Sequence, residues 1–303
     1  MLHPRAFKVT VVWTLLLLLL GSVVHATESS LACPDWPTCF GTMIPEMSGG
    51  IFWEHLHRLV AGGLGMMFAL GTWLARKEAT DQPWVFRVSL AGLALIVVQS
   101  LVGALTVLYR LPDLVSTTHL ALAFLFLALA TVLASGTGPV RTQAMTPHVR
   151  LRVRSLAALA AGLVFAQSVL GALVRHTEAG MACPDVPLCL GRVVPPLVNA
   201  PVIIHFTHRV LALMVTFVVI TIAVWARRAR VPVFTRGWLE AAAFLVVAQV
   251  GLGVASVTTA LSVAPVSAHT LVAATLLATL VRAGTLAHMA RSPRAEAASV
   301  VTV

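Results

Sequence analysis

The sequence predicts an all-α polytopic membrane protein with eight transmembrane helices. Of the 303 residues, 58% are hydrophobic and only 11% are charged, whereas about a quarter of the residues of a soluble protein are charged. Apolar stretches of about 20 residues, a length that crosses a bilayer core about 30 Å thick, recur along the chain. The second half of the sequence also repeats the first. The composition excludes a soluble enzyme, a disordered chain and a disulfide-stapled secreted domain.

The apolar stretches are separated by short charged turns and by two longer loops, at about 27–50 and 177–199. We expect spans at residues 7–26, 51–75, 87–109, 114–135, 153–176, 200–226, 236–259 and 265–288. The first stretch could instead be a signal peptide, because Val24-His25-Ala26 resembles a small-residue cleavage site. The repeat argues against this, since the first span corresponds to the fifth, which is internal. We therefore expect it to be retained.

The internal repeat has an offset of 150 residues. Residues 21–41 align without gaps with residues 171–191, and eleven of the 21 positions are identical. Each half contains four spans, an even number, so the two halves have the same orientation in the membrane. We expect two pseudo-twofold-related four-helix bundles, an N-terminal bundle of residues 1–140 and a C-terminal bundle of residues 141–303.

The basic residues predict the orientation. The net charge is +10, and with a cytoplasmic N-terminus only five of the 21 Lys and Arg residues fall outside: Arg58, Arg110, Arg175, Arg192 and Arg209. Because Lys and Arg accumulate in cytoplasmic loops, we expect a multi-pass protein of the cytoplasmic membrane, with both termini inside and the two long loops outside. This bias explains the charge without a nucleic-acid partner.

Four of the eleven histidines stand within spans at repeat-matched positions: His57, His119, His208 and His269. A lone histidine in a membrane span often makes a hydrogen bond inside a helix bundle. However, His57 and His119 each lie five or six residues into an inward-running span, which puts both imidazoles roughly 8–10 Å below the outer surface. Two histidines at one depth on different helices can bind one haem iron from opposite faces. The pattern predicts one haem site in each half.

Arg58 and Arg209 directly follow two of these histidines. Each can be an interfacial anchor that reaches the lipid headgroups. Each can equally be a guanidinium fork that binds haem propionates near the outer surface. Both roles stay open, and both can hold together.

Each long loop contains the motif Cys-Pro-Asp-x-Pro-x-Cys, with Cys33 and Cys39 in the first loop and Cys183 and Cys189 in the second. The expected orientation puts both pairs in an oxidising compartment, where disulfides persist. Zinc is not expected, because no nearby histidine spacing completes a tetrahedral set. We expect a structural disulfide in the second loop. For the first pair a redox role is an alternative, since that loop leads directly to the second span.

The two halves differ at Glu54, which lies one helical turn before His57 on the same helical face. Its counterpart in the second half is His205. A carboxylate here can be a favourable charge at a helix N-terminus. Its presence in one half only instead indicates that this half carries out proton chemistry. The first half is therefore the candidate active site.

The set Glu54-x-x-His57-Arg58, His119, His208-Arg209 and His269, with eight spans and paired loop cysteines, resembles the haem A synthase family over essentially the whole chain. It is most similar to the bacterial form with both cysteine pairs. The resemblance implies oxidation of the C8 methyl of haem O to a formyl group by successive hydroxylations, giving haem A for terminal oxidases. It places Glu54, His57 and His119 on the substrate side, and His208 and His269 as ligands of a resident haem b. His55 has no role in this scheme.

The resemblance also implies partners: a haem O synthase that supplies the substrate and a terminal oxidase under assembly that receives the product. The sequence has no nucleotide or flavin motif, so the electron donor is external, such as quinol or thiols. Membrane lipid surrounds the spans, and a homo-oligomer is left open. The four histidines alone equally permit a non-catalytic dihaem b-type electron-transfer protein, and a haem carrier is a third alternative. The carboxylate in one half favours the enzyme.

Overall fold

The computed structural model describes residues 2–78, 80–137 and 144–291 of the chain. Over these residues the structure contains eight α-helices that are long and apolar enough to cross a membrane, which confirms the predicted fold class. They are α1 (His3–Ala26), α2 (Gly49–Ala75), α3 (Pro83–Leu108), α4 (Asp113–Gly136), α5 (Pro147–His176), α6 (Ala200–Arg228), α7 (Val233–Thr258) and α8 (Val263–Met289).

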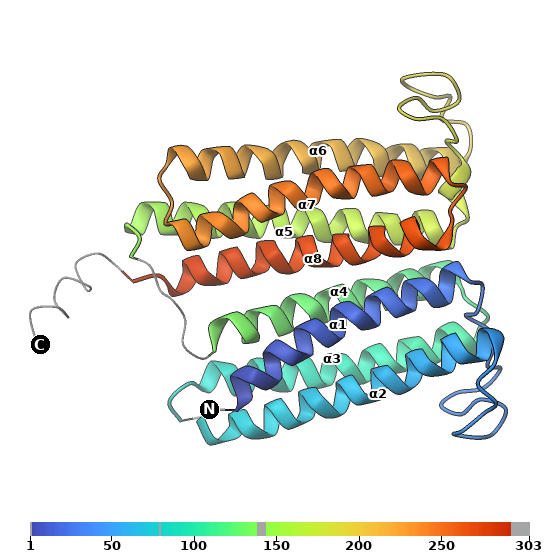
Figure 1. The fold of residues 1–303 in the computed structure, drawn as a ribbon, viewed down its shortest axis with the longest axis horizontal. Coiled ribbons are helices and arrows are strands. Elements are labelled where there is room, and N and C mark those ends of the chain that lie inside the picture. Colours follow the sequence, from blue (N-terminus) through green and yellow to red (C-terminus); the bar gives the residue numbers. More distant parts are fainter. Residues whose placement is uncertain (1, 79, 138–143, 292–303) are drawn as a thin grey trace, which may run out of the picture.

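The helices form two groups of four, α1–α4 and α5–α8 (Figure 1). Within each group, the first helix packs on the second and fourth, and the third packs on its two chain neighbours. Contacts between the groups involve α1, α4, α5 and α8. Both long loops emerge at the same end of the molecule, on the right of Figure 1, which we call the loop end.

The buried core is not confined to the separate groups. One apolar cluster lies within the first group, where the Phe68 ring contacts Phe7 in a tilted arrangement and Phe126 edge-on. The larger cluster joins Leu18, Phe124 and other residues of the first group to the aliphatic interior of α5–α8. The two groups therefore share a continuous interior.

The helices end within two residues of the expected positions, but most begin earlier. α3 begins four residues and α5 six residues before the expected starts at residues 87 and 153. Both helices have proline in the first turn, as do α1 and α6. Proline fits the first helical turn because its missing N–H has no partner there. The polar residues after it continue the helix past the apolar stretch from which the spans were predicted.

The C-termini of α3 and α7, which lie at the loop end, have the same hydrogen-bond pattern. After α3, the Leu111 N–H bonds to the Thr106 carbonyl at 2.7 Å, and after α7 the Leu261 N–H bonds to the Ser256 carbonyl at 2.8 Å. These 6→1 bonds satisfy carbonyls that a helix leaves unpaired at its C-terminus. Each requires a left-handed residue, and non-glycine residues, Arg110 and Ala260, occupy these positions with φ of 56° and 49°. The repeat thus extends to the backbone conformation of the turns.

Some sequence-based expectations fall outside the described residues. Arg141 and Arg294, two of the basic residues assigned to the cytoplasmic side, lie there, and so does the boundary expected between residues 140 and 141. The pseudo-twofold relation of the two groups stays a prediction. So does the orientation in the membrane.

We predict that the loop end faces outward and the opposite end faces the cytoplasm. The reason is the distribution of basic residues, because Lys and Arg near span ends favour the cytoplasmic side. Alkaline phosphatase fused after residue 190 should be active, and fusions after residues 80, 145 or 230 should be inactive. A cytoplasmic fluorescent reporter should show the opposite pattern. Phosphatase activity at residue 145 would refute the orientation.

Candidate functional site

The structure brings the four predicted histidines together in two pairs near the loop end. His57 on α2 and His119 on α4 lie close enough to interact electrostatically, and so do His208 on α6 and His269 on α8. In each group the pair comes from the second and fourth helices, as the repeat predicted. This is the arrangement that a bis-histidine site between two helices requires.

Each of these imidazoles lies flush against a glycine of a neighbouring helix. A Cβ atom added to Gly103 would lie 2.7 Å from Cε1 of His119, and one added to Gly253 would lie 3.2 Å from Cε1 of His269. The same added atom would lie 3.1 Å from His57 at Gly21 and 3.0 Å from His208 at Gly171. An added Cβ at Gly103 would force the ring of His119 to move, and at the other three glycines the ring would have to give by a few tenths of an ångström.

Three of the four histidines have a buried ring nitrogen without a protein partner among the described residues: Nδ1 of His57, of His119 and of His269. Buried polar atoms are nearly always paired, so each such atom indicates a missing partner. The backbone carbonyls of Gln99 and Gln249 act on His119 and His269 respectively. The open nitrogens and the glycine cradles fit an iron porphyrin held between the two rings of a pair.

His208 differs from the other three because a side chain contacts it. The Gln167 amide nitrogen lies 3.1 Å from its Nδ1 and also donates to its backbone carbonyl at 3.0 Å. The matched residue of the first group is Leu17. The same amide nitrogen lies 3.3 Å from Nε2 of His208, so it stands against both ring nitrogens. The second histidine pair therefore has a polar neighbour that the first pair lacks at the matched position.

Glu54 is buried at the start of α2 and joins the helix to the first loop. Its Oε2 accepts a hydrogen bond from the Cys33 N–H at 2.8 Å, and its Oε1 accepts one from Arg58 at 2.5 Å. The Arg58 guanidinium also donates to the carbonyls of Asp35 and Thr38, both at 2.6 Å. Glu54 and Arg58 thus hold the Cys33–Cys39 loop down on α2.

His205 and Arg209 hold the second loop on α6, as Glu54 and Arg58 hold the first loop on α2. The donor and acceptor roles toward the loop are reversed. Arg209 Nε donates to His205 Nε2 at 3.1 Å, so the proton of the neutral imidazole is on Nδ1, which donates to the Ala179 carbonyl at 2.9 Å. Arg209 also donates to the carbonyls of Asp185 and Leu188, both at 2.8 Å. The carboxylate of the first group accepts from its loop, whereas the imidazole donates to its loop.

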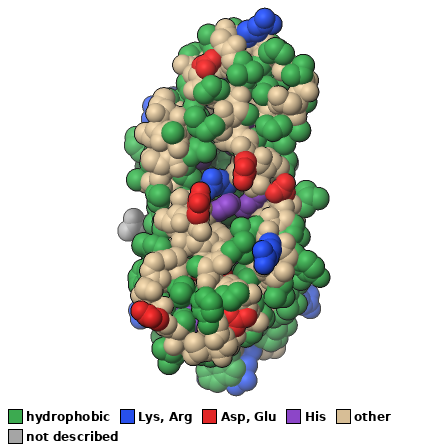
Figure 2. All heavy atoms as spheres, turned by 90° about the vertical axis from the view of Figure 1, so that its right-hand side faces the viewer, with side chains coloured by type: hydrophobic (Ala, Val, Ile, Leu, Met, Phe, Trp, Pro, Cys, Tyr) green, Lys and Arg blue, Asp and Glu red, His purple; other side chains and the backbone are tan. Residues whose placement is uncertain are grey.

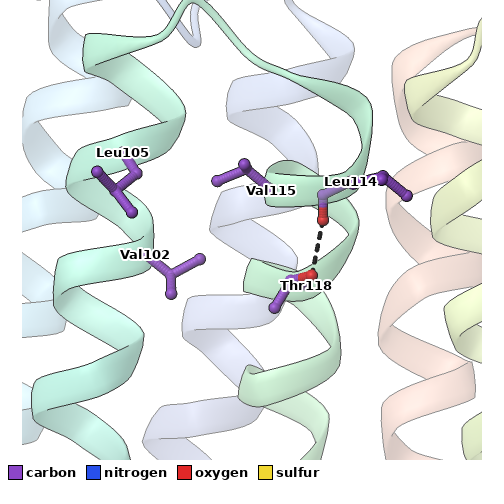
Figure 3. A pocket seen from close by; sticks show the side chains of 5 residues that line it. All are labelled: Val102, Leu105, Leu114, Val115 and Thr118. Carbon is purple, nitrogen blue, oxygen red and sulfur yellow. Dashed lines mark hydrogen bonds between the residues drawn. The ribbon is translucent and has the colours of Figure 1, made fainter.

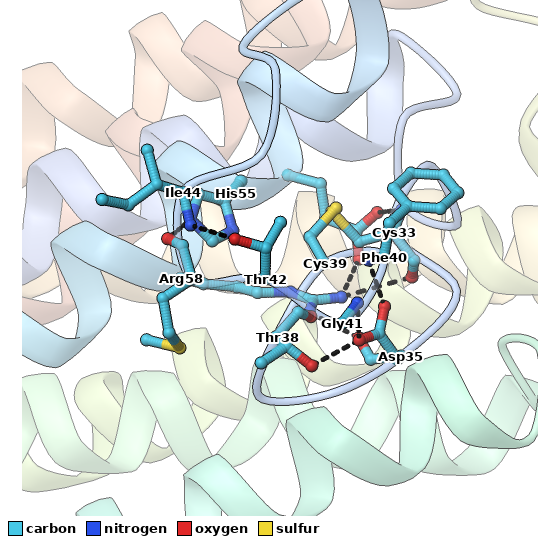
Figure 4. The surroundings of a disulfide bond; sticks show 12 residues. Cys33, Asp35, Thr38, Cys39, Phe40, Gly41, Thr42, Ile44, His55 and Arg58 are labelled. Carbon is cyan, nitrogen blue, oxygen red and sulfur yellow. Dashed lines mark hydrogen bonds and ion pairs between the residues drawn. A yellow bond between two sulfur atoms is a disulfide. The ribbon is translucent and has the colours of Figure 1, made fainter.

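Both loops contain a disulfide, as expected. The Cα atoms lie 4.8 Å apart in Cys33–Cys39 and 4.6 Å apart in Cys183–Cys189. Next to each second cysteine is a tight turn whose two central residues have positive φ, Phe40-Gly41 and Leu190-Gly191. In the first loop, the Asp35 carboxylate accepts hydrogen bonds from Thr38, Phe40 and Gly41, and these lower the pKa of this exposed carboxyl. Figure 4 shows these contacts.

His55, to which the sequence pattern assigns no role, is buried beside the first disulfide (Figure 4). Its Nε2 lies 3.0 Å from the Met43 carbonyl, and its Nδ1 has no described partner. The sequence alone does not predict that His55 lies beside the disulfide. The path of the loop between residues 39 and 55 determines this distance.

A further polar cluster joins the two helix groups at the loop end. His25 Nε2 and His176 Nδ1 share a hydrogen bond of 3.1 Å, and Arg175 donates to the His25 carbonyl at 3.0 Å. Glu28 and Glu178 act electrostatically on Arg175. Figure 2, which views the loop end, shows histidine and basic side chains at the middle of this face with acidic side chains around them. The sequence predicted no role for these residues.

An apolar groove lies between the loop-end parts of α3 and α4 (Figure 3). Its volume is about 200 Å³, and its lining consists of Val102, Leu105, Leu114, Val115 and Thr118. The repeat-matched residues of the second group are Leu252, Ala255, Ala264, Pro265 and Ala268. The long side chains at positions 105 and 114 are replaced by alanine there. The side chains on this part of α3 and α4 therefore differ in shape from those at the matched positions of α7 and α8.

The contacts of Arg209 with the second loop generate a prediction for Arg209→Lys. A lysine keeps the charge but cannot fork to several carbonyls. Loss of one charge-assisted hydrogen bond, after allowance for solvent screening, corresponds to about a tenfold change in local opening. We therefore expect the amides of Cys189, Gly191 and Arg192 to exchange hydrogen at least about tenfold faster in the variant. Mass spectrometry of the protein in nanodiscs measures this exchange.

Arg192→Lys is the matched control for this experiment, because the Arg192 side chain is exposed in the same loop. It should leave the exchange of all three amides unchanged. Equal exchange in Arg209→Lys and in the wild-type protein would show that Arg209 does not hold the loop.

Known proteins resemble this chain over most of its length. A family model described as cytochrome oxidase assembly protein, COX15-CtaA, matches residues 5–51 and 46–281. The haem A synthase of Alkalihalophilus pseudofirmus is 31% identical over 259 residues, which cover 83% of this chain and 86% of the relative. The haem A synthase of Symbiobacterium thermophilum is 34% identical over 227 residues, covering 71% of this chain and 72% of the relative.

The matches extend over both helix groups and include all four histidines in the two pairs. The extent of the family match shows that this chain belongs to the COX15-CtaA family of cytochrome oxidase assembly proteins.

Proposed function

We propose that this chain is a haem A synthase, which oxidises the C8 methyl of haem O to a formyl group and so makes haem A for terminal oxidases. The observation that carries the proposal is the pair of half-buried histidines in each helix group, each ring against a glycine, in a chain of this family. The relatives quoted above bear the name haem A synthase.

We assign the substrate to the first group and a resident haem b to the second. His57 and His119 would hold the iron of haem O, and His208 and His269 would hold haem b. Glu54 supports this division, because the first group has a carboxylate one turn before its α2 histidine and the second group has His205 at the matched position. A resident haem would supply reversible one-electron transfer. This assigns substrate chemistry to residues 1–140 and the cofactor to residues 141–303.

The apolar groove between α3 and α4 fits the same division. Haem O carries a long isoprenoid tail, which haem b lacks. Leu105 and Leu114 line the groove in the first group, and the second group has alanine at both matched positions. We propose that the isoprenoid tail packs in this groove.

In this scheme Glu54 is the catalytic carboxylate. It lies at the outer end of the helix that carries His57 and is buried, and its partner Arg58 keeps its charge balanced. A buried, hydrogen-bonded carboxylate can hold or pass the protons that methyl oxidation releases. Arg58 and Arg209 donate most of their N–H groups to the loops and the neighbouring side chains. The remaining N–H groups are the donors that we propose for haem propionates.

The proposal also covers location and partners. The protein lies in the cell membrane with the cysteine loops outside, receives haem O from a haem O synthase and delivers haem A to terminal oxidase assembly. Its electron donor is external, a quinol or a thiol. A dihaem b-type electron-transfer protein would use the same four histidines but would leave haem O unchanged, and a haem carrier would do so as well.

Replacement of His269 tests the resident haem. His269→Ala should remove the low-spin bis-histidine spectrum of the purified protein and lower its haem b content at least about tenfold, because one axial ligand is lost. Gly253→Ala should weaken the same signal, since its Cβ would lie 3.2 Å from the ring. Gly251→Ala is the control, because a Cβ there meets nothing within 4 Å. An unchanged spectrum in His269→Ala would remove this assignment.

Replacement of Glu54 tests the catalytic assignment. Glu54→Gln keeps the size of the side chain and one oxygen that can accept from the Cys33 N–H, but it removes the charge and the basicity. General acid–base groups contribute about 10²–10⁴-fold to rates, so haem A formation should fall at least about a hundredfold. Haem O or a hydroxylated intermediate should accumulate, as chromatography of the extracted haems measures, while haem b in the second group is retained.

Glu240→Gln is the control for charge removal, because Glu240 pairs with Arg227 and Arg236 at the end of the molecule opposite the loops. It should leave haem A formation unchanged. Hydrogen exchange at Cys33 separates the two roles of Glu54, since loosening of the loop alone would raise the exchange. A normal rate of haem A formation in Glu54→Gln would leave Glu54 only the structural role.

A further inference from the structure

Three potential metal ligands meet under the first loop. Sγ of Cys33, Sγ of Cys39 and a ring nitrogen of His55 all lie within 4.8 Å of one another, and all three side chains are buried. A zinc ion with two thiolates and one imidazole has its ligand atoms roughly 3.5–3.8 Å apart, given Zn–S and Zn–N bonds of about 2.3 and 2.0 Å. The three residues therefore need only small movements to surround one ion.

The hydrogen bond of His55 to the loop backbone is of the kind that a metal-binding histidine makes. Its Nε2 lies 3.0 Å from the Met43 carbonyl, which can only accept, so Nε2 carries the proton. Nδ1 is then the free lone pair, and it is buried without a described partner. Metal-binding histidines almost always donate their other N–H to a carbonyl or carboxylate in this way. A free lone pair in this position indicates that a metal ion is the missing partner of Nδ1.

The second loop is the internal comparison. It has the same Cys-Pro-Asp-x-Pro-x-Cys motif, the same disulfide and the same tight turn, but the residue matching His55 is Phe206. Phe206 packs on the apolar cluster of Cys183, Cys189 and Val202. An apolar side chain is therefore sufficient to support a disulfide of this kind. The disulfide itself therefore does not require an imidazole at this position.

We propose that Cys33, Cys39 and His55 form a redox-gated site for a thiophilic divalent cation, Zn²⁺. In the oxidised protein the disulfide keeps the site closed. A dithiol transfers two electrons and two protons to the Cys33–Cys39 bond, which breaks to give two thiols, and the dithiol becomes a disulfide. Zn²⁺ then binds both sulfurs and Nδ1 of His55, and the two thiol protons pass to solvent. The site is separate from the proposed haem chemistry and does not depend on it.

The test compares zinc content before and after reduction. Purified full-length protein in nanodiscs is treated with dithiothreitol, desalted anaerobically, incubated with Zn²⁺, desalted again and analysed by elemental mass spectrometry. Reduced protein should contain one more zinc per chain than oxidised protein. Zinc on the haem-site histidines is the same in both samples and cancels in the difference. Bound zinc should also protect Cys33 and Cys39, but not Cys183 and Cys189, from alkylation.

Two reciprocal variants make the test specific. His55→Phe copies the second loop, so it should still form both disulfides but lose the extra zinc. Phe206→His copies the first loop and should add a second reduction-dependent zinc. Peptide mapping of the oxidised variants confirms that their disulfides have formed. No extra zinc in reduced wild-type protein, or an undiminished extra zinc in His55→Phe, would overturn the proposal.

Discussion

Both histidine pairs depend on one kind of contact, in which an imidazole ring lies against a glycine in a neighbouring helix. Gly21, Gly103, Gly171 and Gly253 each remove the one atom that would otherwise meet a histidine. Because helix packing in a membrane gains little from the hydrophobic effect, close backbone approach at small residues determines how the helices meet. The same glycines that let the helices approach also aim the four rings inward. The same four glycines therefore determine both how closely the helices pack and where the histidine rings lie.

The two sites are also mechanically linked. Ser22 follows Gly21 in the chain and shares a hydrogen bond of 3.1 Å with Thr270, which follows His269. One helical turn further out, His25 and His176 join the two groups again. With a shared apolar interior below these contacts, the groups meet through matched neighbours of their own site residues. The two histidine pairs are thus connected through chain neighbours that are hydrogen-bonded to each other.

Much of this could be predicted from the sequence, since a bilayer permits few backbone structures and a repeat supplies an internal alignment. The spans, the histidine pairs and the disulfides follow from length, periodicity and matched motifs. What could not be predicted depends on how the loops fold back. His55 reaches the disulfide, and Arg58 reaches three loop carbonyls, by a path through turns with unusual φ values. The His25–His176 contact depends on the packing of two helices from different halves, and no local pattern reports that.

The exchange of Glu54 for His205 has a consequence for how the two halves could diverge. A carboxylate can only accept hydrogen bonds, so its loop must present an N–H, that of Cys33. The imidazole donates through Nδ1, so its loop must present a carbonyl, that of Ala179. Substitution of either residue by the other would set acceptor against acceptor or donor against donor. The loop backbone would therefore have to change conformation together with the side chain. The difference between the two halves lies in the main chain as well as in the side chains.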